Sequence, residues 1–341
     1  MGSTNGEISF DVPKECIAGV VINEGPDFHI EVKNVPVPEI GPDDVLIKLN
    51  ATGLCMSDVH FMLHDWAYPP MSVFNTQCAG HEGAGVIVKV GEHVKHLKIG
   101  QRAGYKPIQD ICHGSYKQYI KSPERYTTLI PDGVSDYIAG PVMCSASTVY
   151  TSLKESGLRP GQWACFPGGG GGVGIQGVQL AAAMGLRTVV VDTGAERRNL
   201  AKESGAEAFI DFKEVENPAA RVVEITAGGA HGVFVTAIQS YPIALDYLGP
   251  RVSGVVMCIG IPTFGRFHMD VDPSRLLGRN QTIKGTLVSS LADVTETLNF
   301  AARGKLRLKP TVVGISKFDE SVQKLRNGQV AGRIVVDFNM E

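Results

Sequence analysis

Hydrophobic residues in the first part of the chain occur in short runs separated by glycine and proline. Between about residues 17 and 130 these runs are "IAGVVI", "VLIKLNATG", "GVIVKVG", "QYIK" and "TTLIP". Short apolar runs with turn residues at such intervals indicate the strands of an antiparallel barrel or sandwich. We therefore expect a β-rich first domain.

The pattern changes after about residue 149, where strands begin to alternate with helices. The strand-like runs "WACF", "RTVVVD", "EAFIDF" and "GVFVTA" are separated by the helix-like "VGIQGVQLAAAMG", "AERRNLAKESG" and "PAARVVEITAGG". "RVSGVVMCIG" and "QTIKGTLV" bring the number of strands to six, which fits a doubly wound parallel sheet that binds a nucleotide. The tail, from "FAARGKLRLKP" to "GRIVVDF", returns to short strands and turns and is expected to rejoin the first domain.

Composition narrows the possible partners. The 32 basic and 35 acidic residues nearly cancel and form no long block of one sign, so we expect no nucleic-acid or membrane partner, and a small-molecule ligand is favoured. Seven dispersed cysteines argue against a disulfide framework. Because we find neither a signal-like segment nor a run of 18 apolar residues, we expect a cytoplasmic protein.

The segment "PGGGGGVG" at residues 167–174 carries Gly169, Gly171 and Gly174 in G-x-G-x-x-G register. A run of five glycines satisfies that register easily, and a flexible loop would do so too. This run, however, follows an apolar strand and opens a helix, which is the context in which glycines let a backbone approach a pyrophosphate. The segment therefore predicts a dinucleotide site.

Asp192 ends the next strand, 18 residues beyond Gly174. A carboxylate there accepts hydrogen bonds from the adenosine ribose and repels a 2′-phosphate, which predicts NAD(H) over NADP(H). Arg197 and Arg198 in the following helix could reach a phosphate, although an exposed helix face is the simpler explanation and the one we favour.

Three potential metal ligands stand far apart in the chain. They are Cys55 in "GLCMSDVH", His81 in "AGHEGAG" and Cys144 in "PVMCSAS". Their spacing fits no compact zinc module, and buried thiols would explain the cysteines as well. Spacing alone therefore leaves a metal site open.

The segments "GLCMSDVH", "GHEGAGVIVKVGEHV", "GGGGGVG", "VVVD" and "AGRIVVDF", in this order, resemble the zinc-dependent alcohol dehydrogenases of the medium-chain dehydrogenase/reductase superfamily, particularly the yeast-type branch. The similarity extends over almost the whole chain. It implies an α/β fold with a GroES-like β-barrel catalytic domain at 1–146, a Rossmann NAD-binding domain with a six-stranded doubly wound sheet at 147–286, and a return to the catalytic domain at 287–341. It also implies Zn²⁺ in the cleft, hydride transfer between NAD(H) and an alcohol/carbonyl pair, and a homo-oligomer, either a dimer or a tetramer.

The resemblance assigns the metal ligands. Cys55, His81 and Cys144 would bind zinc, and Glu82 would be a nearby or exchangeable ligand that belongs to the catalytic group. Two thiolates and one imidazole leave a fourth position open, as in a catalytic rather than a structural zinc site.

The resemblance also implies a proton relay through Ser57 and His60, although an ordinary surface histidine would account for His60 alone. Imidazole titrates near neutral pH and could pass the proton to solvent. The expected cofactor contacts are Thr148, Gly169, Gly171, Gly172, Val173, Gly174, Asp192, Arg197, Ile259, Ile261 and Arg333.

The chain departs from the family pattern at three places. Met56 stands where relatives often have His or Arg near the pyrophosphate, so one cofactor contact is lost. Pro107 stands where the ethanol-specialised branch has tryptophan, which predicts a substrate bulkier than ethanol, with Trp66 as a remaining aromatic wall. In place of a lobe with four cysteines and a structural zinc, residues 104–119 hold only Cys112, which predicts one zinc per chain.

Two other functions stay open. A zinc-free NADPH-dependent reductase of the same superfamily fits the fold, but Cys55, His81 and Cys144 argue against it. A catalytically weakened nucleotide-binding protein fits the lost lobe, but Ser57 and His60 argue against that.

Overall fold

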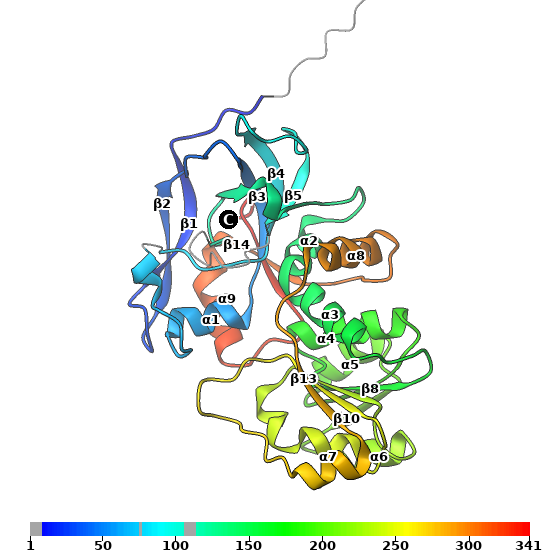
Figure 1. Ribbon diagram of the computed structural model, residues 1–341. Helices are drawn as coiled ribbons and strands as arrows, with labels where there is room; N and C mark the ends of the chain where they lie inside the picture. Colours follow the sequence, from blue (N-terminus) through cyan, green and yellow to red (C-terminus); the bar gives the residue numbers. More distant parts are fainter. Residues whose placement is uncertain (1–8, 75–76, 106–113) are drawn as a thin grey trace, which may run out of the picture. The chain divides into compact units, whose positions relative to one another are not determined.

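The protein divides into two compact units in a computed structural model, which describes residues 9–74, 77–105 and 114–341 (Figure 1). Unit 1 consists of residues 1–143, 311–327 and 334–341, and unit 2 of residues 144–310 and 328–333. This division differs from the expected one, because residues 144–146, 287–310 and 328–333 belong to unit 2. Within unit 2, α8 (Leu291–Ala302) packs against α3 (Ser147–Glu155), which explains the later boundary.

Unit 1 is built on a mostly antiparallel sheet in the order β14-β15-β3-β4-β5-β7, in which β6 also pairs with β3. A separate hairpin joins β1 and β2. The predicted β-rich first domain is therefore confirmed. Its elements are β1 (Glu15–Ile22), β2 (His29–Pro36), β3 (Asp44–Gly53), α1 (Met56–Leu63), β4 (Gly83–Val90), β5 (Arg102–Tyr105), β6 (Tyr119–Pro123), β7 (Thr127–Leu129), α2 (Asp136–Pro141), β14 (Thr311–Gly314), α9 (Phe318–Arg326) and β15 (Ile334–Asp337).

Unit 2 contains the predicted parallel sheet of six strands, in the order β10-β9-β8-β11-β12-β13. Strand β9, "RTVVVD", exposes only its first residue, because the sheet is covered on both faces and selects continuous β-branched runs. Helices α3 and α4 lie on one side of the sheet and α6 and α7 on the other (Figure 1). The elements are α3, β8 (Trp163–Pro167), α4 (Gly172–Ala183), β9 (Arg187–Asp192), α5 (Ala195–Glu203), β10 (Ala208–Asp211), α6 (Pro218–Ile225), β11 (Gly232–Val235), a 3₁₀ segment (Ile238–Leu248), β12 (Val255–Cys258), α7 (Pro273–Arg279), β13 (Thr282–Gly285) and α8.

The tail is more helical than predicted. Strands β14 and β15 do join unit 1, but α9 lies between them, and the start of "FAARGKLRLKP" ends α8. In α9 the buried Phe318 and Val322 stand four residues apart, while Lys324 and Glu320 pair on the exposed face. This spacing is helical, but nine residues carry too few apolar positions for the pattern to be conspicuous in the sequence. In the part of the chain that is described, no helix combines the length and the apolar character needed to cross a membrane.

Candidate metal centre and nucleotide site

The pairing of β3 with β4 brings three candidate ligands together. Thr52 in β3 lies opposite Gly83 in β4, so Cys55, which follows β3, comes close to His81 and Glu82, which precede β4. The ligand atoms of Cys55, His81, Glu82 and Cys144 all lie within 4.8 Å of one another. The expected metal ligands therefore form one cluster.

Cys144 enters this cluster from a widened helical turn. It lies in a π-helical segment, Val142–Ala146, between α2 and α3, directly after the last residue of unit 1 in this stretch. A π-turn inserts one residue into a helix and redirects its side chains, and such turns are frequent at functional sites. The preceding helix α2 packs against β3 and β4, which places the π-turn beside the other ligands.

Asp58, which the sequence analysis did not single out, holds His81 in place. Its buried carboxylate accepts hydrogen bonds through Oδ1 from His81 Nδ1 (2.6 Å) and Gly80 N (3.1 Å). Oδ2 accepts from Tyr116 Oη (3.2 Å) and Cys55 N (3.3 Å). Because Nδ1 of His81 donates to Asp58, Nε2 is the ring nitrogen available to a metal. The sequence feature that could have identified Asp58 is its position within "GLCMSDVH", three residues after Cys55.

The donor set fits zinc. Zinc takes thiolate, imidazole and carboxylate ligands, and tetrahedral ligands at its usual bond lengths lie about 3.3–3.8 Å apart, which the cluster can accommodate. A carboxylate on the second ring nitrogen is the usual partner of a metal-binding histidine. Burial and the neighbouring Asp58 raise the pKa of Tyr116 well above its usual value, so Tyr116 remains a neutral donor to that carboxylate.

The expected relay residues both lie on α1. Ser57 Oγ is 3.7 Å from Cys55 Sγ. His60, one turn further on, has its Nδ1 2.7 Å from Asp65 Oδ1, and its ring stacks on Trp66 with the centroids 4.8 Å apart. The structure therefore brings Trp66 to the relay histidine and adds Asp65, which the sequence analysis did not name.

Met56 begins α1 and is exposed. Pro107, Cys112 and His113 lie outside the described residues. The width of the substrate pocket and the absence of a second zinc therefore stay predictions.

The glycine-rich loop connects β8 to α4 at the point where the strand order of the sheet reverses, between β8 and β11. Gly168 takes the left-handed turn with φ of +83°. A Cβ atom at Gly174 would lie only 2.4 Å from the Gly168 carbonyl oxygen, so the start of α4 can pack onto the loop only with glycine there. The sequence register included Gly174, but it missed Gly168 as the turn residue.

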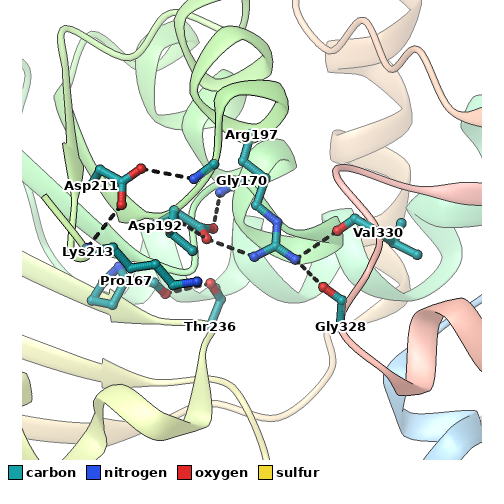
Figure 2. Close-up of polar contacts among 11 residues, drawn as sticks. Pro167, Gly170, Asp192, Arg197, Asp211, Lys213, Thr236, Gly328 and Val330 are labelled. Carbon is teal, nitrogen blue, oxygen red and sulfur yellow. Dashed lines mark hydrogen bonds and ion pairs between the residues drawn. The ribbon is translucent and has the colours of Figure 1, made fainter.

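Asp192, at the end of β9, lies against this loop (Figure 2). It is 4% exposed. Oδ2 accepts a hydrogen bond from Gly170 N (2.9 Å), and Oδ1 accepts from Thr193 N (2.8 Å) and from Arg197 Nη1 (3.0 Å). The carboxylate is therefore oriented by two backbone amides and paired with a guanidinium.

Residues 328–333 are held against the same loop. Arg197 Nη2 donates to the carbonyls of Gly328 (2.7 Å) and Val330 (3.1 Å) (Figure 2), and the Gly332 amide donates to the Gly170 carbonyl (2.9 Å). A Cβ atom at Gly172 would lie 2.7 Å from Cδ of Arg333, which places the expected cofactor residue Arg333 at the start of α4.

The remaining nucleotide-site residues are more scattered. Arg198 pairs with Asp211 (3.3 Å) and Glu214 (2.5 Å) and not with Asp192, which supports the reading of Arg198 as part of an ordinary helix face. Thr148 lies in α3 and Val173 in the first turn of α4, and Ile259 and Ile261 follow β12. Their contacts with a cofactor stay predictions.

Comparison with known proteins identifies the family. Residues 41–132 match the family described as alcohol dehydrogenase GroES-like domain, and residues 172–303 match the family described as zinc-binding dehydrogenase. The chain is 35% identical to alcohol dehydrogenase 1 of Neurospora crassa, over 96% of this chain and 98% of that protein. It is 33% identical to an alcohol dehydrogenase of Schizosaccharomyces pombe, over 96% and 99%.

Among solved structures, acetophenone reductase from Geotrichum candidum in complex with NAD is similar in fold. Its TM-score is 0.80 and its identity 24%, over 97% of this chain and 99% of that chain. The two matched families, the near full-length curated relatives and the two sheets together show that the chain belongs to the alcohol dehydrogenases of the medium-chain dehydrogenase/reductase superfamily, oxidoreductases that transfer a hydride between an alcohol and its carbonyl compound.

Proposed function

We propose that the protein interconverts an alcohol and its carbonyl compound with zinc held by Cys55, His81, Cys144 and Glu82 and with NAD(H) as the hydride carrier. The observation that carries this proposal is the convergence of the four ligand atoms within 4.8 Å. The hydrogen bond from His81 to buried Asp58 supports it, because it leaves Nε2 ready to bind a metal.

Bound zinc would supply a Lewis acid that acidifies the alcohol or polarises the carbonyl. The residues of the chain prepare the site for it. The Cys55 amide and His81 share Asp58, so one carboxylate sets the position of two neighbouring ligands. Ser57, beside Cys55 and on the same helix as His60, would receive the alcohol proton, and His60 would release a proton to solvent.

The preference for NAD(H) over NADP(H) rests on Asp192. Its negative charge and ribose-binding oxygens both oppose a 2′-phosphate. The NAD in the Geotrichum structure supports the same cofactor class. Arg198 is already paired with Asp211 and Glu214, whereas Arg197 is the arginine of α5 that pairs with Asp192.

We propose a substrate bulkier than ethanol. Pro107 replaces a large aromatic residue of the ethanol-specialised relatives, and Trp66 lies beside the relay histidine. The similarity to a reductase named for acetophenone, an aromatic ketone, is consistent with this size class. Turnover of a panel of aliphatic and aromatic alcohols, aldehydes and ketones with both cofactors would test it, and kcat/KM highest for ethanol would contradict it.

The zinc mechanism is tested by Cys144→Ser with Cys258→Ser as the matched control, because Cys258 lies at the end of β12 and is not part of the cluster. We expect Cys144→Ser to lose bound zinc and turnover while its circular dichroism stays native, and Cys258→Ser to keep both. Near-normal activity of Cys144→Ser with NADPH would favour the zinc-free reductase. Tight cofactor binding by the wild type without turnover of any alcohol would favour the weakened nucleotide-binding protein.

A homo-oligomer and a cytoplasmic location remain part of this proposal. Light scattering of the purified protein and fractionation of its source cells would test them.

A further inference from the structure

His60 is held by a carboxylate that follows it in the chain. His60 Nδ1 and Asp65 Oδ1 are 2.7 Å apart, and the two side chains are 12% and 29% exposed. Helix α1 ends in a left-handed residue, His64, with φ of 50°. The Asp65 amide then donates back to the His60 carbonyl at 3.3 Å. The turn that ends the helix therefore builds the pair.

The same turn places the ring of Trp66 against the face of the His60 imidazole. The ring of Trp66 stacks on His60 with an interplanar angle of 16°, and Phe61 packs edge-on against Trp66 at 5.3 Å. Asp65 thus restrains His60 within the plane of its ring, and Trp66 restrains it perpendicular to that plane.

We propose that Asp65 is a positioning residue for proton transfer by His60. An ionised carboxylate can only accept, so the ring proton of His60 resides on Nδ1 and the lone pair on Nε2. Nε2 then takes the proton released by the alcohol and returns it to water, while Nδ1 keeps its own proton. This inference rests on the proposed function, because it assumes that His60 ends the relay.

At the end of α1 and on the helix packed against it, three further described residues, His64, Lys324 and Asp319, have partners of their own. His64 Nε2 bonds to the Tyr68 carbonyl at 3.1 Å. On α9, which packs against α1, Lys324 pairs with Glu320 (2.6 Å), and Asp319 accepts from the Ile30 amide (2.8 Å). Asp65 is therefore the group to vary.

The chain offers a matched control. Asp43 Oδ1 lies 3.3 Å from His93 Nδ1, and this second aspartate–histidine pair is 78% and 59% exposed at the surface of the same unit. Asp43→Asn removes the same charge from the same kind of pair, without any place in the proposed relay.

The experiment compares Asp65→Asn, Asp65→Glu, His60→Gln, the double variant His60→Gln/Asp65→Asn and Asp43→Asn in alcohol oxidation across pH. For Asp65→Asn we expect kcat to fall about tenfold at about pH 6. At about pH 9 we expect kcat to fall less than about twofold, because hydroxide then replaces the lost base. KM should not change, Asp65→Glu should recover part of the rate, and the double variant should be no slower than His60→Gln. Asp43→Asn should match the wild type.

Nitrogen-15 NMR of the histidine rings provides a readout without turnover, with His60 assigned by its loss in His60→Gln. The wild type should show His60 protonated on Nδ1 at alkaline pH, and Asp65→Asn a mixture of tautomers. An equal loss of kcat at every pH, an unchanged tautomer, or a further loss in the double variant would overturn the role of Asp65. An unchanged pH profile in His60→Gln would overturn the relay and the Asp65 inference with it, while the zinc and NAD(H) proposals would stand.

Discussion

At the scale of single residues, Asp58 has the largest number of roles at the candidate metal centre. Four donors, from Cys55, Gly80, His81 and Tyr116, converge on its two oxygens. Asparagine has nearly the same shape, but it has no charge and only one acceptor oxygen. Asp58→Asn should therefore weaken the positioning of the metal ligands while all four ligand side chains remain.

We predict that Asp58→Asn lowers the affinity for zinc by about 10–100-fold, the usual effect of losing the partner of a metal-binding histidine. Competition with a chromogenic chelator would measure it, and Asp43→Asn serves as the control. Zinc affinity equal to that of the wild type would show that Asp58 is needed for the fold alone.

Asp192 has a comparable role in the nucleotide site, since it binds the loop amide of Gly170 and pairs with Arg197. We predict that Asp192→Ala lowers kcat/KM for NAD by about tenfold and has a smaller effect on NADP, because the lost charge opposed the 2′-phosphate. Glu214→Gln, at an exposed carboxylate on Arg198, is the control. A wild type that prefers NADP would contradict the assignment.

At the scale of elements, the loop between β8 and α4 requires a left-handed backbone conformation at Gly168. Gly168 has φ of +83°, and a Cβ there would lie 2.7 Å from Cβ of Ala237. Gly161 has a similar φ of +85°, but nothing lies within 4 Å of its Cβ position. Alanine at Gly161 would therefore introduce backbone strain alone, whereas alanine at Gly168 would introduce both strain and a steric collision.

We predict that Gly161→Ala costs about 1 kcal/mol of unfolding free energy and Gly168→Ala about 2 kcal/mol or more, since the second adds overpacking to strain. Urea unfolding would give both values. Equal losses would mean that the loop shifts to accept the methyl group.

A partly buried histidine of unit 2, His231, links the start of β8 to Arg251. His231 Nδ1 faces the amide of Trp163 at 3.1 Å, and Nε2 faces Arg251 Nη1 at 3.1 Å. Both neighbours are donors, and burial, followed by the positive charge of Arg251, lowers the pKa of His231 below its ordinary value of 6.5. The folded protein therefore disfavours protonated His231.

Because the folded-state pKa is lowered, the stability associated with neutral His231 is present above about pH 6.5 and falls as pH drops below that value, where the unfolded chain binds the proton more readily. We predict that wild-type unfolding free energy declines from about pH 6.5 to pH 5 more steeply than that of His231→Gln, although the variant is less stable at neutral pH. Denaturant titrations at each pH would measure both slopes, and parallel slopes would contradict the prediction.

At the scale of the whole molecule, the chain is expected to bind one zinc. Between residues 104 and 119 only Asp110, Cys112 and His113 have side chains of a kind that binds zinc, and a closed tetrahedral site needs about four. Metal analysis of protein purified without chelators should give one zinc per chain, and Cys112→Ser should leave that number unchanged. Two tightly bound zinc ions, or the loss of one on substituting Cys112, would reveal a second site.

Much of the fold could be predicted from the sequence because its signals are local. The parallel strands β8, β9 and β11 are buried along almost their whole length, so they appear as uninterrupted apolar runs such as "TVVV". Helix α9 was missed because nine residues with three buried positions give a weak period. The boundary near residue 310 was missed because it depends on the packing of α8 against α3, which leaves no mark on either segment alone.

By itself, the sequence determined the alternation of strands and helices in unit 2, the location of the glycine-rich loop and, through its resemblance to known relatives, the identity of the candidate ligands. Only the tertiary structure decided that Cys55, His81, Glu82 and Cys144 meet, because their convergence depends on the register of β3 on β4 and on the π-turn at Cys144. It also decided which carboxylates hold the functional groups. Asp58 and Asp65 do not stand out in the sequence, and hydrogen-bond geometry at about 3 Å can be read only once the chain has folded back on itself.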